Sequence, residues 1–171
     1  MQLSVHVIAA LAVCSRLADV GTTYLVTPTL KLEANAIVRR FGWRFGALTV
    51  VLGLFAYVSP PFGIVIATMS FIVAAFNSSK ILMARALGED EMVEIGRRVF
   101  LATPPWPGLL YLVMPGIFIA VPAVMLLQFY PDASEWGYYF ALGMLGYSLA
   151  VFVHYPVRFF RVRAQAKKAG R

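Results

Sequence analysis

The chain has 171 residues, of which 60% are hydrophobic and 13% are charged, and its formal net charge is +7. Its mean hydropathy of +0.76 is too high for a soluble domain, whose surface must be polar. The composition therefore predicts an integral membrane protein. Because strict alternation of apolar and polar residues is missing, we expect helical spans and not the strands of a barrel.

Five apolar segments approach the length that a helix needs to cross about 30 Å of hydrocarbon. In chain order they are residues 3–26, 43–58, 62–84, 107–129 and 136–157, and the second is the shortest. We therefore expect an all-α fold, a five-helix transmembrane bundle over residues 1–157. Short interfacial helices are expected near residues 32–42 and 88–100, followed by a basic cytoplasmic tail at residues 158–171.

Lys and Arg residues flank the first and third connections and follow the last span, whereas the second and fourth connections have none. Since cytoplasmic loops hold an excess of Lys and Arg, this distribution predicts an outside N-terminus and a cytoplasmic C-terminus. The expected location is a prokaryotic cytoplasmic (inner) membrane, with the protein in multi-pass form. The positive charge then lies beside anionic headgroups, which predicts membrane lipids as partners and no nucleic acid.

The first predicted span carries a polar stripe. Arg16, Asp19, Thr22 and Thr23 fall within an arc of about 120° on a helical wheel. An Arg or Asp at the centre of a span costs about 2.5 to 3.5 kcal/mol, so this face is expected to avoid lipid. Two interpretations stay open, an ion, proton or substrate site and a structural Arg16–Asp19 pair that fixes the helix register.

A second polar set follows this span. Glu33 and Asn35 offer the oxygen ligands that suit Mg²⁺, and Arg39 and Arg40 could neutralise a lipid phosphate beside them. This set predicts a metal or headgroup site, and the alternative is a charged interfacial turn. Asn77 and Lys80, near the predicted cytoplasmic end of the third span, extend the candidate set. The favoured interpretation of Lys80 is that its side chain extends to the lipid headgroups.

The segment "DVGTT", Asp19 to Thr23, and the later "EAN", Glu33 to Asn35, resemble a small bacterial and archaeal membrane-protein family known only as a domain of unknown function. That family's pattern is Asp-x-x-Thr-Thr followed by Glu-Ala-Asn-Pro, and Ala36 stands here in place of the proline. The resemblance covers the first quarter of the chain. It implies the position of a site and no particular reaction.

The last predicted span has small residues at Gly137, Ala141, Gly143 and Gly146, which permit close helix contact within the bundle, in a homo-oligomer or with another membrane protein. No phosphate loop, zinc motif or nucleophile elbow occurs in the sequence. The leading hypothesis is therefore a non-catalytic accessory, assembly or regulatory subunit. The alternatives are a membrane-embedded Mg²⁺-dependent enzyme acting on a phosphorylated lipid, and a component of an ion or proton pathway.

Overall fold

The computed structural model describes residues 4–33 and 36–169, and these residues form helices and short connections without a strand. The elements are α1 (Val5–Val26), α2 (Ala36–Leu48), the 3₁₀ helix η1 (Thr49–Tyr57), α3 (Pro60–Ala102), α4 (Pro105–Phe129) and α5 (Trp136–Ala169). This confirms the all-α prediction. Among the described residues, α1, α3, α4 and α5 are long and apolar enough to cross a membrane, which supports a membrane protein.

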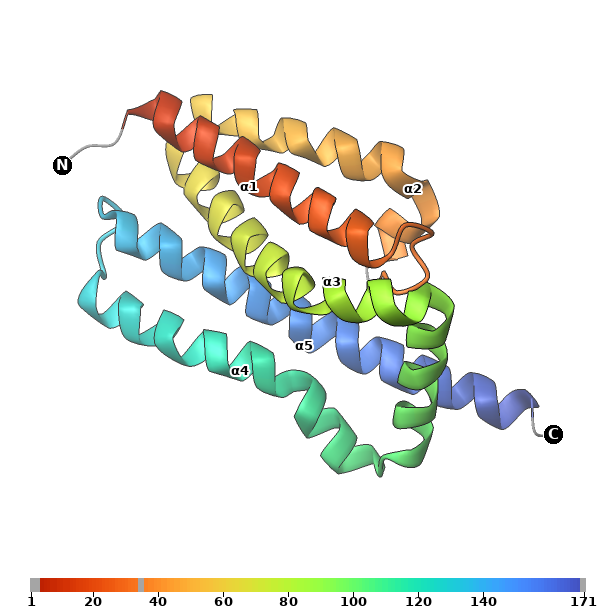
Figure 1. The fold of residues 1–171 in the computed structure, drawn as a ribbon. Coiled ribbons are helices and arrows are strands. Elements are labelled where there is room, and N and C mark those ends of the chain that lie inside the picture. Colours follow the sequence, from red (N-terminus) through yellow and green to blue (C-terminus); the bar gives the residue numbers. More distant parts are fainter. Residues whose placement is uncertain (1–3, 34–35, 170–171) are drawn as a thin grey trace.

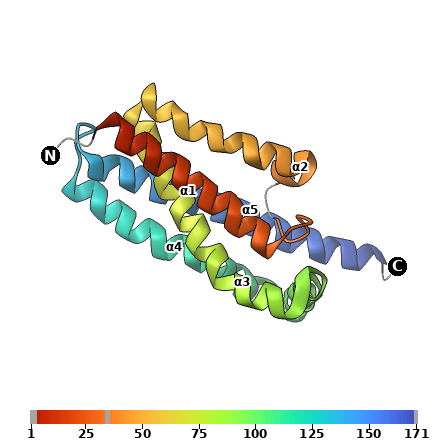
Figure 2. The ribbon, with the colours of Figure 1, turned by 45° about the horizontal axis from the view of Figure 1, so that its top comes forward.

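The second predicted span, residues 43–58, is not a single α-helix. Its first part belongs to α2, and from Thr49 the chain continues as η1. A 3₁₀ helix rises about 2.0 Å per residue, so η1 reaches about 18 Å where an α-helix of the same length would reach about 14 Å. Figures 1 and 2 both show α2 and η1 running beside α1 in the opposite direction.

The two ends of the bundle differ in charge. At one end lie the start of α1, the η1–α3 turn and the α4–α5 turn, and at the other lie the α1–α2 connection, the α3–α4 turn and the end of α5 (Figure 1). We name the first the acidic end, because its two turns contain Asp132 and Glu135 but no Lys or Arg. We name the second the basic end, because Lys31 and the Arg- and Lys-rich end of α5 lie there.

Two of the long helices depart from the predicted spans. α3 contains a break at Gly88, whose φ of +77° is readily adopted only by glycine, and residues 89–102 then run across the basic end (Figure 1). α5 is helical to Ala169, twelve residues beyond the predicted end of the last span. The described part of the predicted tail is thus a helix. The interfacial position of residues 36–42 and 89–100 remains a prediction.

The helices pack in a row, with η1 against α1, α1 against α3, α3 against α5 and α5 against α4. Near the acidic end the contacts are close, because a Cβ added at Gly63 would lie 2.5 Å from the Cβ of Ala56. Ile8, Ala9 and Ala56 form an apolar cluster at this level. Around this cluster α1, η1 and α3 are therefore tightly packed, with small residues at the contacts.

Candidate functional site

A cavity of about 470 Å³ lies in the half of the bundle toward the basic end. Its walls come from α1, α2, η1, α3 and α5 and from the connection between α1 and α2. The charged residues that line it are Arg16, Asp19, Glu33, Lys80 and Arg158. A volume between about 300 and 1,000 Å³ with a few convergent polar groups is typical of small-ligand sites, so we take this cavity as the candidate site.

Arg16 connects three elements at the inner side of the cavity. Its Nη1 donates to Asp19 Oδ2 at 2.5 Å and to Ser70 Oγ on α3 at 3.3 Å, and its Nη2 donates to Thr49 Oγ1 on η1. The Arg16 and Asp19 side chains are only 20% and 12% exposed. The Nε of Arg16 is a buried donor for which the described residues supply no acceptor. The two charges therefore neutralise each other inside the bundle.

The polar faces of α1 and α3 meet at a second point. Asn77 Nδ2 donates to Thr23 Oγ1 at 2.8 Å, and Thr23 Oγ1 donates to Asp19 Oδ1 at 3.4 Å. Thr22 behaves differently, because its hydroxyl donates to the carbonyl of Ala18 in its own helix at 2.8 Å. Of the predicted stripe, the structure thus brings Arg16, Asp19 and Thr23 to the cavity, while Thr22 is not among the residues that line it.

Lys80 lies in the cavity wall without a hydrogen bond or ion pair to any residue that the structure describes. Asn77, about one turn before Lys80 on the same face of α3, donates to Thr23 of α1. Asp19, the nearest candidate as a counter-ion on α1, is already bonded to Arg16 and Thr23. The interpretation that Lys80 reaches toward the headgroups stays a prediction, and the structure adds that Lys80 lines the cavity.

The contribution of α5 was missed by sequence reasoning. Tyr147, His154, Tyr155 and Arg158 all line the cavity, although Arg158 was assigned to the predicted tail. Spacings of seven, eight and eleven residues place these side chains on one face of a helix. This periodicity is visible in the sequence, but the predicted end of the last span at residue 157 assigns Arg158 to the tail and the other three residues to the span.

The connection between α1 and α2 forms one wall of the cavity and is held at several points. Arg158 Nη1 donates to the carbonyl of Leu32 at 2.8 Å. Trp43 Nε1 donates to the carbonyl of Pro28 at 2.7 Å, and the ring of Trp43 packs against that of Tyr24. Its contacts with α1, α2 and α5 indicate a fixed wall.

Glu89, directly after the break in α3, makes the most contacts with this connection. Its Oε1 accepts from the hydroxyl of Thr27 and from the amide of Lys31 at 2.7 Å. Its Oε2 accepts from the amide of Thr29 at 3.0 Å and from the Thr29 hydroxyl at 2.6 Å. Burial raises the pKa of Glu89, but these hydrogen bonds outweigh it, so the pKa lies below its usual value. Sequence reasoning did not single out Glu89, because its partners are about sixty residues away.

The other predicted members of the metal or headgroup site are distributed as follows. Glu33 lines the cavity, and its charge acts on both Asp19 and Arg158. Arg39 and Arg40 are exposed on α2 and do not line the cavity. Asn35 lies outside the described residues. Within the described ranges, no three His, Cys, Asp or Glu residues are grouped so that they could hold a metal ion.

The predicted packing residues of α5 lie at different contacts. A Cβ added at Gly143 would lie 2.6 Å from the Cβ of Thr68, so α3 and α5 approach closely there. A Cβ at Gly146 would meet the sulfur of Met69 at 3.0 Å, and at Gly137 the nearest atoms belong to Tyr130. Ala141 is fully buried. These four residues contact other parts of the same chain, and an oligomer interface remains a prediction.

No protein-family model, no curated protein and no solved structure matches this chain. The resemblance carried by "DVGTT" and "EAN" therefore stays a prediction, and the geometry of the cavity is the basis for the function proposed below.

Proposed function

We propose that this protein is a non-catalytic accessory subunit of the inner membrane that binds the headgroup of an anionic lipid in its polar cavity. The observation that carries the proposal is Lys80, an ammonium group in the cavity wall without a partner among the described residues. An unpaired charge is costly to bury, and an anionic ligand would remove that cost. Apolar neighbours such as Val73 and Phe76 suit the chains of a lipid.

The charges of the cavity favour an anion. Arg16, Lys80 and Arg158 face two carboxylates, Asp19 and Glu33, and Arg16 is already paired with Asp19 at 2.5 Å. One positive charge is thus in excess, with two tyrosine hydroxyls and one imidazole on α5 as further hydrogen-bonding groups. A phosphate diester of a lipid headgroup carries one negative charge and several acceptor oxygens, which matches this set.

The proposal includes the membrane topology. Five passes, with α2 and η1 as the second, agree with the start of α1 and the end of α5 at opposite ends of the bundle (Figure 1). The excess of Lys and Arg at the basic end supports placing that end in the cytoplasm. The cavity then opens at the level of the cytoplasmic leaflet, where anionic headgroups lie.

The packing toward the acidic end favours binding over conduction. Toward the acidic end, the buried hydroxyls of Ser15 and Thr68 donate to carbonyls of their own helices, and the apolar cluster around Ala56 follows. Among the described residues no polar path thus leads from the cavity to the acidic end.

The test is competition between lipids in nanodiscs that contain equal amounts of phosphatidylglycerol and phosphatidylcholine. Native mass spectrometry should show retained phosphatidylglycerol, and Lys80→Gln should reduce its retention about tenfold, since one charge-assisted contact is worth about 1.4 kcal/mol. Lys168→Gln is the matched control, because Lys168 is exposed near the end of α5. Equal retention of the two lipids by the wild type, or equal losses in the two variants, would refute the proposal.

A further inference from the structure

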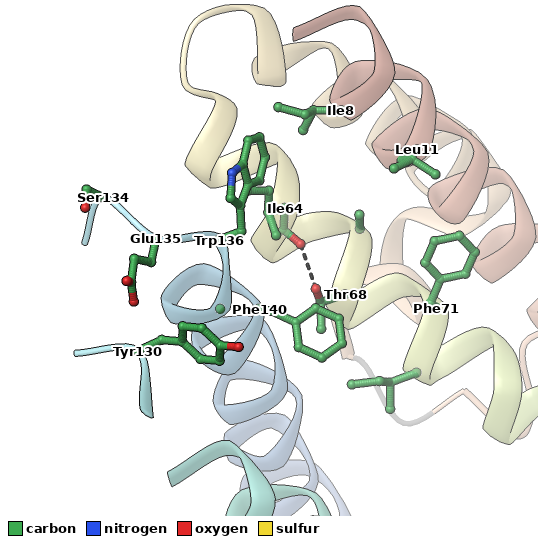
Figure 3. Close-up of a pocket in the computed structure, with 13 residues that line it drawn as sticks. Ile8, Leu11, Ile64, Thr68, Phe71, Tyr130, Ser134, Glu135, Trp136 and Phe140 are labelled. Carbon is green, nitrogen blue, oxygen red and sulfur yellow. Dashed lines mark hydrogen bonds between the residues drawn. The ribbon is translucent and has the colours of Figure 1, made fainter. Parts of the chain in front are cut away.

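A separate groove of about 780 Å³ lies near the acidic end, between α1 and α3 on one side and the start of α5 on the other (Figure 3). Its walls are apolar and include Ile8, Leu11, Ile64, Phe71 and Phe140. Thr68 also lines the groove, but its hydroxyl donates to the carbonyl of Ile64 at 2.8 Å, as Figure 3 shows. The groove therefore offers almost no free polar group along its walls.

The shape and position of the groove suit a hydrocarbon chain. Ile64, Thr68 and Phe71 follow one face of α3 over about 10 Å, so the groove runs along a membrane-spanning helix. Leu11 is 44% exposed and Phe71 is 48% exposed, which leaves both side chains open to a partner. These residues belong to helices that are long and apolar enough to cross a membrane, where a hydrocarbon chain can reach them.

Polar groups gather only at one end of the groove. Ser134, Glu135 and Trp136 lie there at the α4–α5 turn, with Tyr130 below them in Figure 3. Glu135 is exposed, and the turns of the acidic end contain no Lys or Arg that would neutralise it. A headgroup with an ammonium would be attracted by this carboxylate and by the aromatic rings, whereas an anionic headgroup would be repelled.

We propose that this groove is a second lipid site, which holds one phosphatidylethanolamine-type lipid of the leaflet at the acidic end. One acyl chain lies between α3 and Phe140, and the ammonium lies at Glu135. The hydroxyls of Ser134 and Tyr130 and the indole N–H of Trp136 line the same end and are donors for the headgroup phosphate. The site selects a zwitterionic headgroup with an ammonium, whereas the cavity at the basic end is proposed to select an anionic one.

The experiment uses the full chain in nanodiscs with equal amounts of phosphatidylethanolamine and phosphatidylglycerol of the same chain length. Native mass spectrometry should show one retained phosphatidylethanolamine per chain, enriched about two- to fivefold over phosphatidylglycerol at this site, the range expected for an exposed ion pair. Glu135→Gln should remove the enrichment, and Asp132→Asn, which removes a charge from the same turn, should not. Absence of enrichment in the wild type would overturn the proposal.

A second pair of variants tests the groove itself. Leu11→Trp fills the groove and should abolish retention of the lipid whatever its headgroup, while Leu17→Trp, at a 54% exposed position of α1 outside the groove, should leave it unchanged. Equal retention by these two variants would place the lipid elsewhere. Lys80→Gln should not affect this lipid, so failure of this proposal and failure of the one for the cavity can be told apart.

Discussion

Replacing Glu89 by Gln should loosen the connection between α1 and α2. The carboxylate accepts bonds from two backbone amides, those of Thr29 and Lys31, one at each oxygen. A glutamine has only one acceptor oxygen, so whichever way its amide is turned, one of these N–H groups faces another donor. A hydrogen bond to a charged group contributes about 1.5 to 3 kcal/mol, and because Glu89 is partly exposed we expect a loss of about 2 kcal/mol.

Hydrogen exchange measures this loss locally. A change of about 2 kcal/mol corresponds to an opening equilibrium about 30-fold more favourable, so protection of the amides of Thr29 and Lys31 should fall by about that factor. Amides within α1 should keep their protection, because their hydrogen bonds are internal to the helix. The measurement is exchange followed by mass spectrometry of the protein in detergent or nanodiscs.

Glu91→Gln is the matched control for this prediction, since Glu91 is exposed on the same segment of α3 and no hydrogen bond of its side chain is seen among the described residues. If Glu89→Gln lowered protection of residues 29–31 no more than Glu91→Gln does, the four hydrogen bonds would not be what holds the connection. The wall of the cavity would then have to be fixed by Arg158 and Trp43, which contact the same connection.

Two further predictions concern pH and helix packing. Because the pKa of Glu89 is depressed below its ordinary value of 4.5, its contribution to stability is complete above that value and is lost as the pH falls through the folded-state pKa. The difference in unfolding free energy between wild type and Glu89→Gln, measured in mixed micelles, should thus be constant from about pH 8 to 5 and shrink below; a constant difference at acid pH would contradict this. Gly143→Ala should lower the unfolding free energy by about 1 to 3 kcal/mol in the same assay, because the added Cβ would lie 2.6 Å from the Cβ of Thr68. In Gly146→Ala the added Cβ would meet only the flexible side chain of Met69 at 3.0 Å, so its unfolding free energy should stay within about 1 kcal/mol of wild type. Equal costs would show that the contact between α3 and α5 is not set at Gly143.

The features predicted well from the sequence are local ones. Apolar length gave the positions of α1 and α4 to within two residues at each end, because the hydrocarbon thickness fixes how many residues a span needs. Helical periodicity placed Arg16, Asp19 and Thr23 on one face, and the structure brings them to one cavity. Both inferences use only neighbours along the chain.

What escaped prediction depends on contacts between distant segments. Nothing near Glu89 in the sequence shows that it binds a connection about sixty residues earlier, because that contact exists only after the break at Gly88 turns the helix across the basic end. The 3₁₀ conformation of η1 was also missed. A Cβ added at Gly53 would lie 2.7 Å from the backbone of Val13, so α1 and η1 pack backbone to backbone, a contact absent from any local pattern.

The pairing of Asp19 determines which positive charge of the cavity is left for a ligand. A buried ion pair is seldom more stabilising than apolar residues of the same size, so stability alone does not explain why Arg16 and Asp19 stand in a membrane span. Their effect is clearer on Lys80. If Asp19 were free to pair with Lys80, the excess positive charge of the cavity would lie on Arg16 and not on Lys80. Because Arg16 holds Asp19 at 2.5 Å and is itself held by Thr49 and Ser70, Asp19 is kept from Lys80 and the positive charge remains available. Asp19→Asn should therefore leave Arg16 without its counter-ion, so that the cavity carries one more positive charge and retains anionic lipid more strongly. If the pair were purely structural, the same variant would disrupt the site and retain anionic lipid more weakly.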